Sequence, residues 1–198
     1  MSTNPITTSN GDEPPVVNID RVDAITARYR KALDLDDDLV ERALDLFYTA
    51  ERARPPGGRG FEYAVPAAIR LACEERNTPG TPDEIAAVGG IDVHKLIQEK
   101  REIARATGTQ TLPIPAEQYL ERYIEELEYG CEAAAVARGS LELIQREKPN
   151  AAPSSIASAS LWVPIKSSDR DDITQSEIAE HTHTDGLTIR DLSSVVLD

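Results

Sequence analysis

The sequence has little from which a disulfide framework or a metal site could be built. It contains only two cysteines, Cys73 and Cys131, and they lie far apart in a chain of 198 residues. A zinc site needs four ligands, and disulfides are rare in cytosolic proteins. We therefore expect two buried free thiols that pack as small apolar side chains, and neither a metal ion nor another cofactor.

Long apolar runs are missing as well. No stretch is long enough to cross a bilayer, and no apolar signal segment follows Met1. Residues 1–18 combine Ser, Thr, Asn and Pro with acidic residues, and this composition predicts a disordered acidic tail. The sequence thus favours a cytoplasmic protein that does not bind membranes.

Aromatic residues make up 5% of the chain, and only five of its 21 basic residues are lysines. Alanine, valine, isoleucine and leucine must therefore fill the core, which suits close-packed helices. The 35 acidic residues give a net charge of −14, and such a surface repels DNA unless arginine is locally concentrated. Because the acidic residues are spread along the chain, adaptation to a halophilic, high-salt cytoplasm is the other explanation, and it would carry no information on partners.

Catalytic motifs are also absent. The sequence has no phosphate-binding loop, no G-x-S-x-G and no dinucleotide fingerprint. His181 and His183 have no third ligand nearby in sequence, so a turn with exposed imidazoles is the simpler interpretation. We expect a protein that is not an enzyme and has no small-molecule substrate.

Apolar residues recur with the period of a helix almost throughout. Val40, Ala43, Leu44 and Phe47 show this i, i+3, i+4, i+7 spacing, and strand-like alternation is absent. Gly- and Pro-containing breakers separate the helices. The pattern predicts an all-α fold with helices near residues 20–33, 37–53, 62–76, 82–88, 92–107, 116–128, 132–147, 154–166, 175–182 and 187–196.

The two halves of this pattern are similar. Residues 81–86 (TPDEIA) correspond to residues 174–179 (TQSEIA), and both begin with a capping box in which Thr and Glu satisfy free amides at a helix start. Asp92 and Leu96 match Asp185 and Ile189 at the same spacing. The sequence therefore predicts a duplicated five-helix unit.

Each half also has a proline within its central helix. Pro66 lies early in its helix, where proline is tolerated. Pro164 lies late, and we expect it to end or kink the helix near Val163.

Several short motifs, in order, resemble the core of archaeal transcription factor B and eukaryotic transcription factor IIB. Residues 58–62 resemble the G-R-S-x-E loop of that family, residues 79–86 its P-R-T-L-D-E-I-A, and residues 174–179 its T-Q-x-E-I-A. Pro115, Tyr119 and Arg122 echo the P-x-x-Y-x-x-R that opens the second repeat, and residues 188–190 match its T-I-R. The resemblance covers roughly residues 20–198.

This resemblance implies two tandem five-helix cyclin-like repeats, over residues 19–110 and 111–198. In that family the first repeat binds the TATA-binding protein, and the second presents a helix-turn-helix, here residues 173–196, to promoter DNA. Full members begin with a zinc ribbon that recruits the polymerase, and residues 1–18 contain no Cys or His. The resemblance therefore implies a regulator of transcription initiation that does not recruit polymerase through a zinc ribbon.

Candidate contacts with DNA are few. From His181 onwards the only Lys or Arg is Arg190, alongside three aspartates, so Thr188 and Arg190 are the candidate DNA-binding residues. Arg190 could instead pair with Asp191 or cap its helix. The alternative function is therefore a cyclin-fold protein-interaction module that has lost DNA binding.

Two groups of basic residues lie in the first half. Arg52, Arg54 and Arg59 would suit an acidic protein surface or the DNA flanking a bent promoter, although a solvated helix end explains them as well. We take them as the candidate protein-binding residues. The second group, Lys95, Lys100, Arg101 and Arg105, is explained equally well by ordinary pairs along a solvated helix.

Overall fold

The structure is a computed structural model that describes residues 18–53, 60–167 and 173–197. Within these ranges the chain forms ten α-helices and no strand, which confirms the predicted all-α class. The predicted disordered tail lies outside the described residues, apart from Asn18. The Asn18 side chain accepts a hydrogen bond from the amide of Arg21 and caps the first helix.

Every observed helix begins and ends within two residues of its predicted position. The helices are α1 (Ile19–Ala32), α2 (Asp37–Ala53), α3 (Phe61–Arg76), α4 (Pro82–Gly89), α5 (Val93–Thr107), α6 (Ala116–Glu126), α7 (Cys131–Glu147), α8 (Pro153–Ser167), α9 (Gln175–Thr182) and α10 (Gly186–Leu197).

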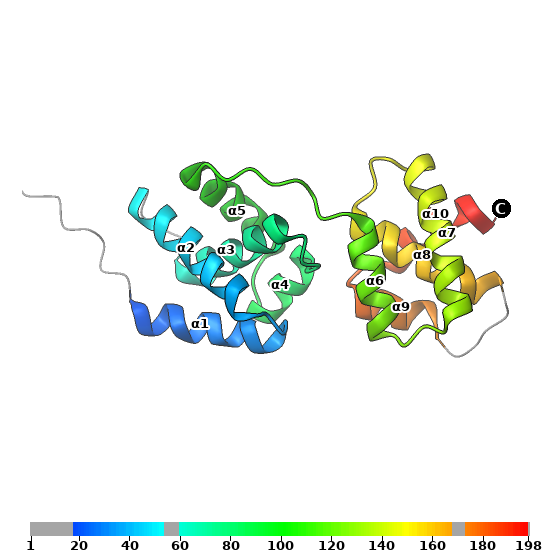
Figure 1. Cartoon of the computed structure of the whole chain (residues 1–198), viewed down its shortest axis with the longest axis horizontal. Coiled ribbons are helices and arrows are strands. Elements are labelled where there is room, and N and C mark those ends of the chain that lie inside the picture. Colours follow the sequence, from blue (N-terminus) through cyan, green and yellow to red (C-terminus); the bar gives the residue numbers. More distant parts are fainter. Residues whose placement is uncertain (1–17, 54–59, 168–172, 198) are drawn as a thin grey trace, which may run out of the picture.

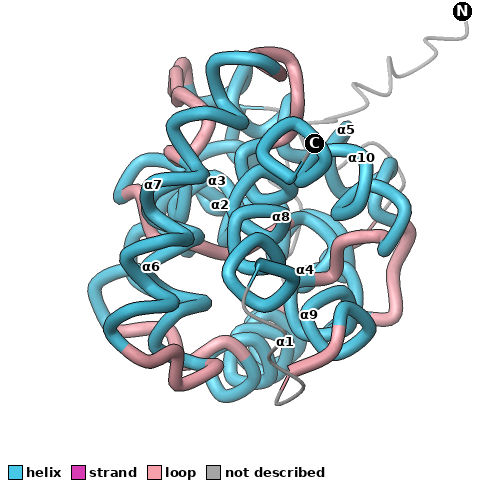
Figure 2. Tube along the Cα trace, turned by 90° about the vertical axis from the view of Figure 1, so that its right-hand side faces the viewer, coloured by secondary structure: helices cyan, strands magenta, loops and turns pink. Residues whose placement is uncertain are grey.

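The helices form two lobes, α1–α5 and α6–α10, which lie side by side along the long axis of the molecule (Figure 1). In each lobe the third helix packs against the other four: α3 contacts α1, α2, α4 and α5, and α8 contacts α6, α7, α9 and α10. Figure 2, viewed along the long axis with the second lobe in front, shows α8 surrounded by its neighbours. This common plan is consistent with a duplicated five-helix unit.

Small side chains allow α3 and α8 to be enclosed in this way. Ala67, Ala68 and Ala72 of α3 and Ala157 and Ala159 of α8 are completely buried. Alanine loses no side-chain entropy on burial and permits close approach of neighbouring helices. The alanine-rich composition of these segments therefore places them at the centre of their lobes.

Helix α8 continues through Pro164 to Ser167, so of the two outcomes expected at this proline, an end near Val163 is wrong. Because proline lacks an N–H, the carbonyl of Ser160 loses its helical partner. The Ser140 hydroxyl from α7 lies 3.5 Å from this carbonyl, and the Tyr129 hydroxyl donates to the next carbonyl, that of Leu161, at 2.9 Å. Hydroxyl donors from neighbouring segments thus reach the carbonyls of α8 at the point where Pro164 interrupts the backbone hydrogen bonds of the helix.

Both predicted capping boxes are present. The amide of Glu84 donates to the Thr81 hydroxyl at 3.1 Å, and the Glu84 carboxylate accepts from the Thr81 amide at 2.5 Å. Thr174 and Glu177 form the same pair of bonds, at 3.2 and 2.6 Å. These bonds fix the first turns of α4 and α9, which occupy the same position in the two lobes.

The two cysteines have different environments. Cys73 is buried in α3, and burial raises the pKa of its thiol to about 11. Cys131 is exposed at the first position of α7, so the expectation of two buried thiols is wrong for this residue. Both cysteines are free, and no helix in the described ranges is long and apolar enough to span a membrane.

Alanine at Gly89 should destabilise the first lobe because α1 approaches α4 closely there. A Cβ at Gly89 would lie 2.2 Å from the Tyr29 hydroxyl oxygen. Overpacking of this kind costs about 1–3 kcal/mol of unfolding free energy. The Tyr29 hydroxyl is buried without a described hydrogen-bond partner, so Tyr29→Phe should be close to neutral and should recover part of the loss in Gly89→Ala. Denaturant unfolding of the unchanged chain, the two single variants and the double variant tests this. An equal loss from Gly89→Ala in the unchanged chain and in the Tyr29→Phe background would contradict it.

Candidate nucleic-acid interface

The segment predicted as a helix-turn-helix folds into two short helices joined by a tight turn. Helix α9 ends at His183, which adopts a left-handed conformation with φ of 51°. The Asp185 carboxylate then accepts a hydrogen bond from the amide of Thr188 at 3.1 Å and caps the start of α10. The turn therefore comprises residues 183–185, a length typical of helix-turn-helix motifs.

One face of α10 packs onto the lobe and leaves a narrow outer face exposed. Ile189, Leu192 and Ser193 are buried, whereas Leu187 is 69% exposed. Asp191 lies on the same outer face, one turn further on, with its side chain exposed. This outer face is poor in the donors that usually read bases.

Thr188 and Arg190 lie on opposite flanks of α10. Residues two apart on a helix are separated by about 160° around its axis, so the two side chains cannot point in one direction. The Thr188 hydroxyl bonds to the Asp185 carboxylate at 3.2 Å and thus belongs to the helix cap. Only Arg190 keeps a long exposed donor, and the two residues would meet different parts of a ligand.

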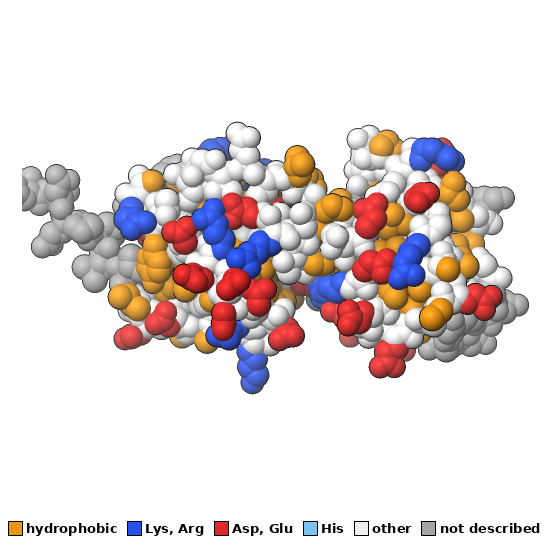
Figure 3. All heavy atoms as spheres, viewed as in Figure 1, with side chains coloured by type: hydrophobic (Ala, Val, Ile, Leu, Met, Phe, Trp, Pro, Cys, Tyr) orange, Lys and Arg blue, Asp and Glu red, His pale blue; other side chains and the backbone are white. Residues whose placement is uncertain are grey.

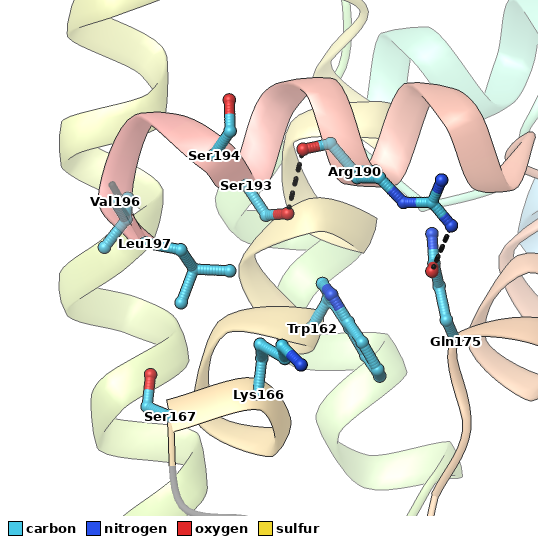
Figure 4. A pocket seen from close by; sticks show the side chains of 9 residues that line it. All are labelled: Trp162, Lys166, Ser167, Gln175, Arg190, Ser193, Ser194, Val196 and Leu197. Atoms are coloured by element: carbon cyan, nitrogen blue, oxygen red, sulfur yellow. Dashed lines mark hydrogen bonds between the residues drawn. The ribbon is translucent and has the colours of Figure 1, made fainter.

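Arg190 points to a pocket between α8, α9 and α10 rather than to Asp191. Its guanidinium donates to the Gln175 side-chain oxygen at 3.4 Å, and the amide nitrogen of Gln175 donates to the carbonyl of Gly186 at 2.5 Å. Figure 4 shows this arrangement, with Trp162 and Lys166 of α8 on the other side of the pocket. Gln175 therefore orients Arg190 and ties the start of α9 to the start of α10.

Asp191, which would oppose a nearby phosphate, is partly compensated. The Lys148 ammonium, from the segment before α8, lies 3.3 Å from its carboxylate. Both groups are exposed, so the pair contributes little to stability. It does lower the local negative charge beside α10.

The proposed protein-binding arginines are only partly within the described residues. Arg52 is exposed near the end of α2 and donates to the Thr49 hydroxyl at 3.3 Å. Arg54 and Arg59 lie outside the described ranges, so the grouping of the three remains a prediction.

The second basic group is not one continuous patch. Lys100 is directed inwards and pairs with the Glu74 carboxylate at 2.7 Å, and Arg105 pairs with Glu102 on its own helix. Arg101 is exposed on α5. Acidic and basic side chains are intermingled on the face of the molecule seen in Figure 3. At least two of the four residues thus have acidic partners within the fold.

A contact between the lobes involves residues that sequence reasoning assigned only to motifs. The Arg122 guanidinium on α6 donates to both Glu84 carboxylate oxygens, at 2.7 and 3.2 Å, and to the carbonyl of Pro79 at 3.1 Å. The Glu84 side chain is 6% exposed and that of Arg122 is 27% exposed. The same carboxylate that caps α4 thus joins the first lobe to the second.

The charged contact continues from α6 to the helix-turn-helix. Arg122 also donates to Glu126 at 2.7 Å, and Glu126 lies 2.8 Å from the ring nitrogen of His181 on α9. The ring of His181 packs edge-on against Tyr123. We call Glu84, Arg122, Glu126 and His181 the interlobe chain, because they connect α4 to α9 through α6.

The segment between the lobes is anchored as well. Ile114 is buried, and the Thr111 hydroxyl donates to the Glu74 carboxylate at 2.6 Å. Glu74 also pairs with buried Arg70 at 3.1 Å. Among the described residues no group of three or more His, Cys, Asp or Glu could hold a metal ion.

Several known proteins are similar to this chain in sequence. The chain is 29% identical over 169 residues to a transcription initiation factor IIB of Archaeoglobus fulgidus, covering 82% of this chain and 50% of that protein. It is 29% identical over 165 residues to transcription initiation factor IIB 2 of Thermococcus kodakarensis, covering 82% and 54%. The chain is thus similar in sequence to archaeal transcription initiation factors IIB.

A halophilic archaeon also has such a relative. Transcription initiation factor IIB 2 of Halobacterium salinarum is 27% identical over 176 residues, covering 86% of this chain and 53% of that protein. No protein-family model matches the chain. The chain spans about half the length of the curated factors IIB it matches. These relatives are initiation factors and not enzymes, in agreement with the expectation from the sequence.

Proposed function

We propose that the chain acts in the archaeal promoter complex as a factor B-like regulator of transcription initiation. The similarity to factors IIB over most of the chain carries this proposal. In it, the first lobe binds the TATA-binding protein, with Arg52, Arg54 and Arg59 as contacts, and α9 and α10 face promoter DNA, with Thr188 and Arg190 on the two flanks of α10.

The helix-turn-helix geometry supports the DNA-binding part. Helix α10 is capped by Asp185, and its outer face is not covered by another helix of the lobe. Helices in this position enter the major groove in proteins that use this motif.

The outer face of α10 supports the alternative function. Exposed Leu187 and Asp191 offer an apolar and an acidic side chain where a DNA reader usually has Arg, Asn or Gln. A protein-interaction module that has lost DNA binding would have such a surface.

A test of assembly on promoter DNA distinguishes the promoter regulator from the protein-interaction module. In a gel-shift experiment with an archaeal TATA-binding protein and a TATA-containing duplex, at several salt concentrations, we expect the chain to form a ternary complex. The triple variant Arg52/Arg54/Arg59→Ala and the single variant Arg190→Ala should each weaken it about tenfold, which corresponds to about 1.4 kcal/mol.

Arg146→Ala is the matched control, because Arg146 is exposed on α7 and pairs only with its neighbour Glu147 among the described residues. This variant should assemble as the unchanged chain does. Absence of a ternary complex at every salt concentration would refute the promoter function and leave the interaction module.

A further inference from the structure

The pocket beside Arg190 brings together cations from two helices. It has a volume of about 690 Å³ and lies between α8, the start of α9 and the later half of α10. Lys166 and Trp162 come from α8 and Arg190 from α10, and all three side chains line the pocket (Figure 4). Among the residues that the structure describes, no acidic side chain lines it.

Lys166 and Arg190 differ from the other described cations of the second lobe in their ion pairing. Its described part contains six lysines and arginines, of which Arg122, Arg138, Arg146 and Lys148 each pair with a described carboxylate. Lys166 and Arg190 have no such ion pair within the described residues, and both line this pocket. In so acidic a chain, two cations that line one pocket without an acidic partner among the described residues favour an anionic ligand.

We propose that this pocket holds a phosphate group of the DNA backbone, so that Lys166 of α8, outside the helix-turn-helix, contacts DNA together with Arg190. The inference rests on the proposed function and deepens it. The Arg190 guanidinium uses one N–H on Gln175, and its remaining donors and the Lys166 ammonium supply the charge and the hydrogen bonds that a phosphate oxygen requires.

The position of the pocket favours the DNA backbone over a free anion. It lies along one flank of α10, next to the outer face that would enter a groove. When a helix occupies the major groove, the phosphates run along its flanks, and flanking cations fix its register on the duplex. Lys148 lies near the opposite flank, so both sides of α10 have a cation in reach.

The protein contains its own probe of this pocket. Trp162 is the only tryptophan in the chain and lines the pocket, so its fluorescence should report what binds there. We would titrate the full chain with a short duplex, with inorganic phosphate and with polyglutamate, and follow Trp162 emission at several salt concentrations.

We expect the Trp162 emission to change saturably with the duplex and not with inorganic phosphate or polyglutamate. Lys166→Gln should weaken duplex binding by about three- to tenfold and lower the salt slope by about one, because each phosphate contact releases about one counterion. Lys166→Arg should restore the slope, and Arg146→Gln, on α7, should leave both quantities unchanged. Lys166 is exposed, so these substitutions do not disturb the core.

Each other outcome contradicts the proposal in a recognisable way. If the duplex binds but Lys166→Gln keeps the full affinity and salt slope, the pocket is not a phosphate site, and the proposed function stands. Saturation by inorganic phosphate alone would make a small phosphate compound the ligand, and saturation by polyglutamate would indicate an acidic protein. If no duplex binds, even in the presence of TATA-binding protein, the proposed function fails first.

Discussion

Replacing Arg122 by alanine should lower the free energy of unfolding by about 3 kcal/mol, because it breaks a largely buried ion pair. This value is the low end of the range for buried ion pairs, and we choose it because the Arg122 side chain is partly exposed. The substitution leaves the buried Glu84 carboxylate and the Pro79 carbonyl without this donor from the second lobe. Thermal and denaturant unfolding measure the loss, and small-angle scattering should show a longer particle as the lobes lose this contact.

Arg138→Ala provides the matched control. Arg138 forms a similarly short ion pair with Glu121, but both side chains are about half exposed, so we expect a much smaller loss than for Arg122→Ala. The double variant Glu84→Gln/Arg122→Met, which removes both charges, should be more stable than Arg122→Ala. Equal small losses for Arg122→Ala and Arg138→Ala would show that the interlobe contact contributes no more than a surface pair.

The second large effect is an increase in stability, expected on replacing the buried Glu51. Glu51, near the end of α2, is 5% exposed, and burial together with the nearby charge of Glu99 raises the pKa of its carboxyl to about 7. In the unfolded chain the group titrates near 4.5. As the pH rises from 4.5 to 7 the unfolded chain releases this proton while the folded chain retains it, so stability falls by about 3 kcal/mol over this window.

Glu51→Gln should remove this dependence. The variant and the unchanged chain should be about equally stable near pH 4.5, and above pH 7 the variant should be more stable by up to about 3 kcal/mol. Melting curves at intervals between pH 4.5 and 8 test this, with exposed Glu41→Gln on the same helix as the control. A constant difference at every pH would show that Glu51 does not titrate in this range.

The sequence predicts the helices well because their signals are local. The capping boxes at Thr81 and Thr174 and the glycine and proline breakers each act within one helical turn, so they fix boundaries without knowledge of the fold. The sequence did not show why the helix continues past Pro164, where donors from α7 and from the segment before it reach the interrupted helix. Such help comes from the tertiary structure and leaves no local trace.

The candidate site was harder to predict for the same reason. Helical geometry alone could have shown that Thr188 and Arg190 lie on opposite flanks. Lys166 could not have been found in this way, because it lies 24 positions before Arg190 and meets it only through the packing of α8 on α10. The contact between Arg122 and Glu84, 38 residues apart, was equally hidden, although both belong to motifs that carried the family resemblance.

The Glu84 carboxylate both caps α4 in the first lobe and binds Arg122 of the second, so we expect the residues at these positions to change together in evolution. One of its oxygens bonds to the Thr81 amide and both bond to Arg122, so a substitution that removes the Glu84 side chain disrupts both interactions at once. Aspartate would be too short to span both, and glutamine would lack the charge. We therefore expect related sequences without arginine at the position of Arg122 to differ also at Glu84, so that changes at the two positions occur in pairs.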